Sequence, residues 1–225
     1  EPSSMPTRTE AKSNTITLKG SAQIVSEFFG YSINSILYQR GIYDPELFDA
    51  TKKYKLRMMV TKDKGLSEYL KNVLEQLTAW LEKGMVQKLV LVIASVDTGE
   101  TLERWVFDVD TNKKCLKDGS TQEKSEKDIM REIQAIIRQI TSSVTFLPLL
   151  EEPCTFDLLI YAPNECKVPE KWEESDPKYI AKSNEVRLRS FTTKIHKVEA
   201  SVAYKACDDS DDEEDQKEKE NELRN

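Results

Sequence analysis

Histidine, glycine motifs and cysteine pairs are scarce in this chain of 225 residues, and their scarcity excludes most kinds of enzyme site. The single histidine, His196, leaves both a zinc site at the usual ligand spacing and a Ser-His-Asp triad without support. All seven glycines stand alone, so no glycine-rich phosphate-binding motif can be written. We therefore expect no catalytic residue, no metal site and no cofactor.

Signs of secretion or of a membrane span are also lacking. The four cysteines (Cys115, Cys154, Cys166 and Cys207) form no C-x-x-C pair, and no apolar leader segment opens the chain. No run approaches the roughly 18 apolar residues that a transmembrane helix needs. We expect reduced thiols in the nucleus or cytosol and no membrane partner.

The net charge of −7 is concentrated at one end of the chain. Residues 208–225 hold ten acids against three bases, and the rest of the chain is balanced, with 30 of each. A balanced body gives no support to direct nucleic-acid binding, which relies on a basic excess. We expect residues 1–15 to be a disordered arm and residues 208–225 a disordered acidic tail. Met5 is the expected natural start, with residues 1–4 left over from cloning.

Apolar periodicity predicts an α+β fold. Apolar residues spaced by three and four predict helices over 16–40, from Leu66 to Gly84, and from a Ser120/Glu123 capping box to Val144. Strands are predicted at 55–61, 86–94, 101–109 and 155–161, and the almost continuously apolar 86–94 is expected at the sheet centre. The main strands form a central, mostly antiparallel three-stranded sheet packed on the three helices.

The C-terminal stretch 186–204 changes its apolar parity twice. Val186 and Leu188 are even, Phe191 and Ile195 odd, and Val198, Val202 and Tyr204 even again. Two consecutive strands with a bulge explain this best from the residues alone. The alternative is a segment that pairs in more than one register. The preceding proline-punctuated stretch has little regular pattern, which is typical of functional or mobile segments.

Long motifs in this chain resemble the HORMA-domain family, in its spindle-assembly-checkpoint branch of the mitotic-arrest-deficient type. They are ITLKGSAQIVSEFF, SINSILYQRGIY, IIRQITSSVTFLPLL, FDLLIY, VPEKWEES and VRLRSFTTKIHKV. The resemblance implies a HORMA domain at 16–207 with a mobile C-terminal β segment, the safety belt, at 162–205. In such proteins the belt covers one sheet edge in an open conformer. In a closed conformer it crosses to the other side and traps a partner peptide as an added strand, which favours the two-register alternative.

The resemblance also implies three sets of site residues. A peptide would lie beside a strand and two tryptophans: Thr155, Phe156, Asp157, Leu158, Leu159, Ile160, Tyr161, Trp80 and Trp172. Open and closed copies would meet through Gln39, Arg40, Arg138, Gln139 and Phe146. The belt latch would be Phe191, Ile195, His196, Val198, Val202 and Tyr204.

The implied function is that of a non-enzymatic spindle-checkpoint adaptor in nucleus and cytoplasm, and at kinetochores in mitosis. It would entrap peptides by open-to-closed conversion and inhibit the anaphase-promoting complex through its activator subunit. The implied partners are that activator, a coiled-coil checkpoint receptor at kinetochores, a second copy of the chain, and a AAA-type remodelling ATPase with its adaptor. Two alternatives remain: a sister HORMA adaptor for a translesion polymerase or the meiotic axis, and a hydrolase of unfamiliar type that depends on His196.

Overall fold

The computed structural model describes residues 15–170 and 172–206. Of the segments predicted to be disordered, 208–225 and residues 1–14 of the arm at 1–15 lie outside the described residues. Thr15, the last residue of the predicted arm, pairs with Glu123 in a short strand, so the arm was predicted one residue too long. Within the described part, none of the helices combines the length and hydrophobicity that a membrane span requires.

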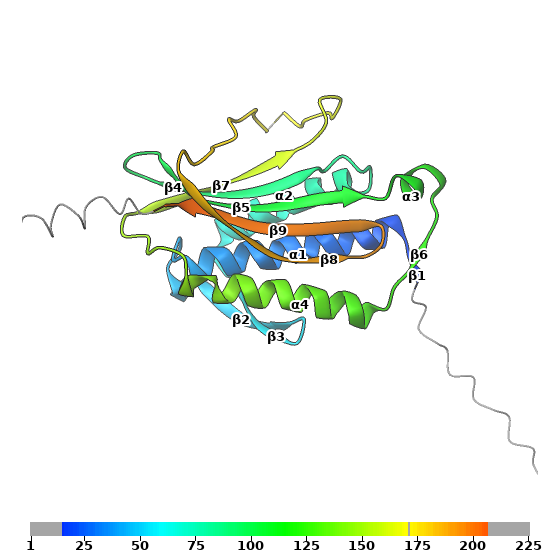
Figure 1. Cartoon of the computed structure of the whole chain (residues 1–225), viewed down its shortest axis with the longest axis horizontal. Helices are drawn as coiled ribbons and strands as arrows, with labels where there is room; N and C mark the ends of the chain where they lie inside the picture. The colour runs from blue at the N-terminus through cyan, green and yellow to red at the C-terminus, as the bar shows by residue number, and fades with distance from the viewer. Residues whose placement is uncertain (1–14, 171, 207–225) are drawn as a thin grey trace, which may run out of the picture.

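Three long helices pack on one face of the sheet (Figure 1). They are α1 (Leu18–Gln39), α2 (Lys64–Leu81) and α4 (Glu126–Ser142), and α1 contacts both of the others. The side chains of Thr17, Asp63 and Ser125 accept hydrogen bonds from backbone amides in the first turns of these helices. These caps satisfy amides that have no partner within the helix, so each helix begins at a defined residue.

The predicted start of the third helix at the Ser120/Glu123 capping box is wrong. The cap is Ser125, whose hydroxyl accepts from the amide of Asp128. The residues before it form the short helix α3 (Lys113–Asp118), which ends at Gly119, and the strand β6 (Gln122–Glu123). Strand β6 pairs with β1 (Thr15–Ile16), so residues 122–123 belong to a ladder rather than to a helix.

The central sheet is antiparallel and has five strands in the order β7-β4-β5-β9-β8. They are β4 (Lys88–Ser95), β5 (Thr101–Thr111), β7 (Cys154–Tyr161), β8 (Ser183–Thr192) and β9 (His196–Lys205). The predicted three-stranded core is present with 86–94 at its centre, and the C-terminal segment adds two strands beside β5. A separate hairpin of β2 (Phe48–Lys53) and β3 (Leu56–Thr61) packs on α1, and only its second strand was predicted.

Both parity changes near the C-terminus have a local cause in this fold. The register between β8 and β9 shifts by one residue between Arg187 and Ser190, which is a bulge. Residues 193–195 form the turn between the two strands, so the second change marks a new strand. The pattern is therefore explained by two strands with a bulge, and pairing in a second register stays a hypothesis.

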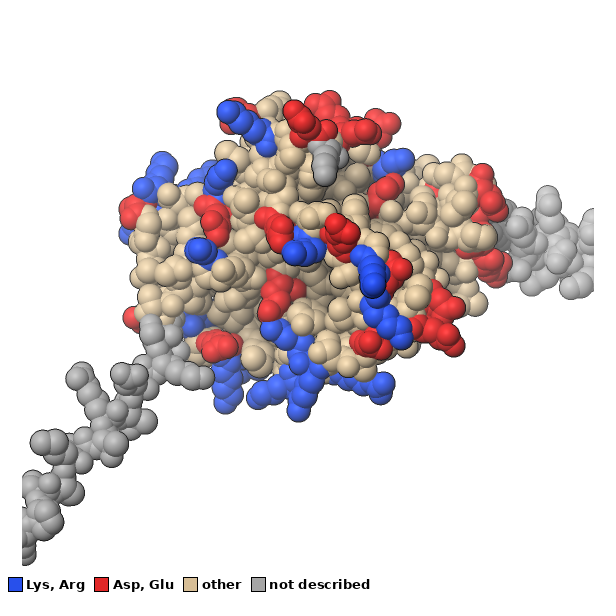
Figure 2. All heavy atoms as spheres, turned by 180° about the vertical axis from the view of Figure 1, so that it is seen from behind, with Lys and Arg blue, Asp and Glu red and all other residues tan. Residues whose placement is uncertain are grey.

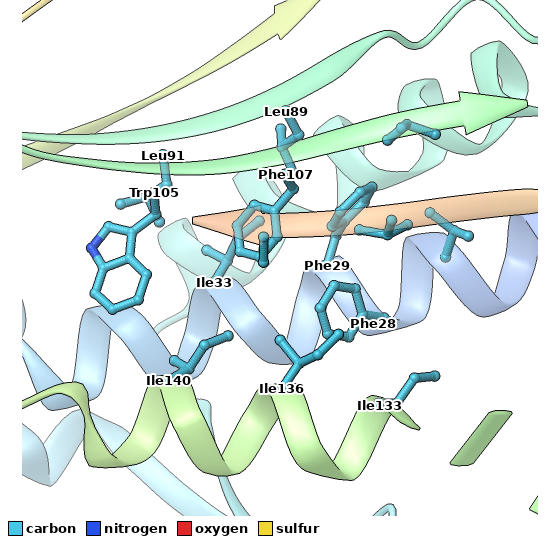
Figure 3. Close-up of a cluster of buried hydrophobic side chains, with 14 of the residues drawn as sticks. Phe28, Phe29, Ile33, Leu89, Leu91, Trp105, Phe107, Ile133, Ile136 and Ile140 are labelled. Atoms are coloured by element: carbon cyan, nitrogen blue, oxygen red, sulfur yellow. The ribbon is translucent and has the colours of Figure 1, made fainter. Parts of the chain in front are cut away.

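The hydrophobic core fills the space between the sheet and the helices (Figure 3). Phe28, Phe29 and Ile33 of α1 and Ile133, Ile136 and Ile140 of α4 meet Leu89, Leu91, Trp105 and Phe107 of the two central strands. Phe191 of β8 joins this cluster, with its ring centroid 4.8 Å from that of Phe28. The hairpin of β8 and β9, residues 183–205, is thus part of the core; we call it the C-terminal hairpin.

Candidate functional site

The two edges of the sheet differ in what covers them. Strand β8 runs along α4, where Gln139 Oε1 accepts the Arg189 amide at 2.6 Å and Glu132 Oε2 accepts the Thr192 amide at 3.0 Å. Strand β7, at the opposite edge, is paired with β4 alone among the described strands. An uncovered strand edge presents unpaired backbone groups to which an extended peptide can add as a further strand. The edge of β7 is therefore the candidate peptide site.

The side chains of β7 alternate between the two faces of the sheet. Phe156, Leu158 and Ile160 pack against the main core on the helical side. On the other face, Leu159 and Tyr161 pack on a second apolar cluster formed by Val90, Val92 and Val106. Apolar contacts on both faces hold β7 in place, so its outer backbone edge is preorganised for a partner.

The segment 162–182, which we call the belt loop, passes around this edge and has no helix or strand in its described residues. On the helical side Trp172 packs on Trp80 of α2, with ring centroids 5.2 Å apart and planes at 68°. On the other face the Tyr179 ring lies 4.6 Å from the guanidinium of Arg104. The loop arches away from the end of β7 and returns to β8 (Figure 1). Because the loop contacts both faces of the sheet, it encircles the edge of β7. The two tryptophans predicted at the peptide site, Trp80 and Trp172, contact each other here.

Two tyrosines that the sequence reading missed flank the same strand. The rings of Tyr43 and Tyr69 stand edge-on to Phe156, with centroids 6.1 and 6.0 Å away. Burial raises the pKa of Tyr69, and the nearby Asp157 carboxylate raises it further. Tyr69 borders the apolar stripe of α2, three residues after Leu66 and four before Val73, and 43% of its surface is exposed. A large aromatic residue at the border of the stripe was the available signal.

The residues expected at a self-association surface do not share one environment. Arg138 and Phe146 are exposed, whereas Gln39 and Gln139 are half-buried. Arg40 is buried in the single chain, and its predicted contact with a second copy stays a prediction. Its guanidinium is buried against β5, where Nε donates to Glu103 Oε1 at 2.8 Å and a second nitrogen donates to the Pro148 carbonyl.

The expected belt latch lies inside the fold. Phe191, Ile195, His196, Val198 and Val202 are buried in the core, and Tyr204 is half-buried. These residues hold the C-terminal hairpin against the helices. The arrangement, with the hairpin beside β5 and the edge of β7 uncovered, is the one the family resemblance implies for a closed conformer.

His196 links the hairpin to two helices through polar contacts. Its Nε2 lies 3.2 Å from the Leu81 carbonyl at the end of α2, and its Nδ1 lies 2.7 Å from the Ser21 hydroxyl of α1. A carbonyl only accepts, so Nε2 donates and the neutral ring accepts at Nδ1 from Ser21. A Ser-His contact is also a hydrolase feature, but both side chains are fully buried and unreachable by substrate.

We expect the fold to lose stability on mild acidification because of His196. Burial lowers the pKa of this imidazole, and the bond to the Leu81 carbonyl offsets part of the shift. The folded protein therefore favours the neutral ring, so its contribution is complete above about pH 6.5 and is lost as the pH falls below it. Urea unfolding from about pH 7.5 to about pH 5.5 should show a loss of up to about 1.4 kcal/mol that is absent in His196→Gln. Equal pH dependence in both proteins would contradict this role.

The molecular surface carries mixed charges. Figure 2 shows acidic and basic side chains interspersed over the back of the molecule, with basic ones gathered along the lower border. This face does not offer the continuous basic stripe that nucleic-acid binding favours.

Comparisons with known proteins agree with this geometry. The HORMA domain model matches residues 21–196. The mitotic spindle assembly checkpoint protein MAD2A of Dictyostelium discoideum is 60% identical over 200 residues, covering 88% of this chain and 98% of its own. Human MAD2A is 60% identical over 190 residues, covering 84% and 93%. A chain in a solved structure described as the crystal structure of the mitotic checkpoint complex superposes with a TM-score of 0.75 at 45% identity, covering 83% of this chain and 99% of that one. This chain therefore belongs to the HORMA-domain family, as a close relative of the mitotic spindle assembly checkpoint proteins.

Proposed function

We propose that this protein is a spindle-assembly-checkpoint adaptor that entraps a partner peptide beside β7. The observation that carries the proposal is the uncovered edge of β7, encircled by the belt loop while the C-terminal hairpin is docked on the far side of the sheet. The high identity to checkpoint relatives supports this role over a sister HORMA function in translesion synthesis or at the meiotic axis.

Slow release of the peptide follows from how the belt loop is tethered. Its first end continues from β7 and its second end enters β8, whose partner β9 is buried against β5. A peptide paired with β7 under this loop can leave only if the loop deforms or the hairpin undocks. Local opening of a buried element carries a high free energy, so bound peptide should dissociate slowly.

The proposed partners are short segments of two proteins: the anaphase-promoting-complex activator, whose capture would inhibit ubiquitin ligation, and the coiled-coil checkpoint receptor at kinetochores. We further propose that the protein has no enzymatic activity and works in nucleus and cytoplasm and at mitotic kinetochores. A AAA-type ATPase with its adaptor would reopen the closed form.

Binding should be tested with arrays of peptides that tile the activator and the receptor, with polymerase and meiotic-axis peptides as competitors. We expect one activator or receptor segment to bind and to stay bound after dilution. Hydrogen exchange should then show new protection at 154–161, with the amides of β8 unchanged. Protection elsewhere, or stronger binding of a competitor class, would refute the proposal.

Self-association is proposed to use Arg138, Gln139 and Phe146 around the end of α4, together with Gln39 and Arg40 at the end of α1. Arg138 is exposed on α4, and arginine beside an aromatic residue is a common hot-spot composition. Replacing Arg138 by glutamate should abolish dimers in size-exclusion chromatography while peptide capture survives. Unchanged dimerisation would remove Arg138 from the surface, and loss of both activities would indicate a folding defect.

A further inference from the structure

One ion pair binds both backbone groups of Thr192, the last residue of β8. The Lys124 ammonium lies 2.7 Å from each carboxylate oxygen of Glu132 and donates to the Thr192 carbonyl, also at 2.7 Å. Glu132 Oε2 accepts the Thr192 amide at 3.0 Å. Lys124 lies just before α4 and Glu132 in its second turn, so side chains at the start of this helix close the end of the outer strand.

These contacts differ from an ordinary surface ion pair. The Lys124 side chain is 12% exposed and that of Glu132 is 32% exposed. The neighbouring pair of Arg131 with Asp128 has 73% and 44% exposed side chains and links two residues of the same helix. Exposed pairs contribute little to stability, whereas charge-assisted bonds to backbone groups in a shielded site are about twice as strong as neutral ones.

The bonds to Thr192 can form only when β8 lies along α4. Thr192 adjoins the turn at 193–195 and His196, where the hairpin reverses. An interaction made in one conformation and not in another shifts the equilibrium by its whole free energy. The free energy of these bonds therefore counts toward the docked position of the hairpin alone.

We infer that Lys124 and Glu132 act as a clasp that holds the C-terminal hairpin docked and thereby sets how long a captured peptide stays beside β7. This inference rests on the proposed function, because the belt loop that encloses the peptide is anchored at its far end by β8. Undocking the hairpin breaks the bonds of the clasp to Thr192, so the clasp raises the barrier to release without touching the peptide. Lys124 and Glu132 are positioning residues in this role.

Two variants and a matched control test the clasp. Glu132→Ala removes the acceptor for the Thr192 amide, and Lys124→Met removes the donor to its carbonyl. Arg131→Ala breaks an exposed pair on the same helix and serves as the control. With a fluorescent form of the peptide selected from the arrays, both variants should release it about tenfold faster, a size typical of losing a hydrogen bond to a charged group. The association rate and the control should stay at the wild-type value.

A measurement without peptide separates failure of the clasp from failure of the proposed function. Hydrogen exchange in the peptide-free protein should become about tenfold faster at 183–205 in both variants, with 88–95 unchanged. Wild-type exchange rates at 183–205, or equal acceleration at 88–95, would overturn the clasp whether or not a peptide binds. Suppose instead that exchange at 183–205 becomes faster in both variants but the wild-type protein retains no peptide. That result would refute the proposed function and would still support the clasp.

Discussion

Replacing Phe191 by alanine is expected to lower the free energy of unfolding by about 3–5 kcal/mol. The Phe191 side chain is 1% exposed and packs edge-on against Phe28 at the centre of the core. Alanine would leave a cavity where β8 meets α1, and the rigid helices on either side limit how far it can collapse. Urea unfolding followed by tryptophan fluorescence measures the loss.

Peptide retention gives a second measure of the same change. If the hairpin undocks before the rest unfolds, Phe191→Ala should release peptide faster even where the domain remains folded. Lys197→Ala, on the exposed side of the same hairpin, should change the unfolding free energy by no more than about 0.5 kcal/mol. A loss below about 1 kcal/mol for Phe191→Ala would show that this ring does not anchor the hairpin.

Arg40→Met is expected to destabilise the protein by about 3–5 kcal/mol, because it leaves the buried carboxylate of Glu103 without its counter-charge. Glu103 is 1% exposed and also accepts a bond from Trp105 Nε1 at 3.0 Å. Burial raises the pKa of Glu103, and Arg40 and the indole N–H oppose that shift. Arg40 thus stabilises the ionised form of Glu103 at a buried position that would otherwise favour the protonated form.

A double variant distinguishes this explanation from simple loss of packing. Arg40→Met combined with Glu103→Gln removes the stranded charge while keeping an acceptor for Trp105, so stability should recover in part. Lys88→Met, which breaks the exposed pair with Asp108, should lower stability by no more than about 1 kcal/mol. No recovery in the double variant would mean that Arg40 acts through its packing on the Pro148 loop. An Arg40→Met protein that folds and still dimerises would remove Arg40 from the self-association surface.

Local sequence signals located most elements but could not choose between similar ones. Ser120 with Glu123 and Ser125 with Asp128 carry the same signal, a serine followed three residues later by an acid. Ser125 rather than Ser120 is the cap of α4 because residues 122–123 pair with β1, a strand more than a hundred residues earlier in the chain. The three predicted core strands were found because their apolar pattern depends only on which faces are buried.

Long-range pairing also explains why the burial of Arg40 was not predicted. An arginine at the end of an amphipathic helix is exposed in most proteins. The residues next to Arg40 in the sequence do not indicate that it has a buried acidic partner. Glu103 lies 63 residues further along the chain, in β5, where the neighbouring Trp105 and Phe107 are buried. Only the packing of α1 on β5 brings the two charges together.

The sequence by itself determined the helices, the apolar strands, the balanced body and, through family resemblance, the strand to which a peptide should add. The tertiary structure decided which edge of the sheet is free, where the C-terminal hairpin docks, and that Lys124 and Glu132 meet Thr192. The physical reason is that strand edges carry the same backbone groups whatever their side chains. Apolar patterns specify faces, whereas the choice of edge depends on contacts between residues far apart in the chain.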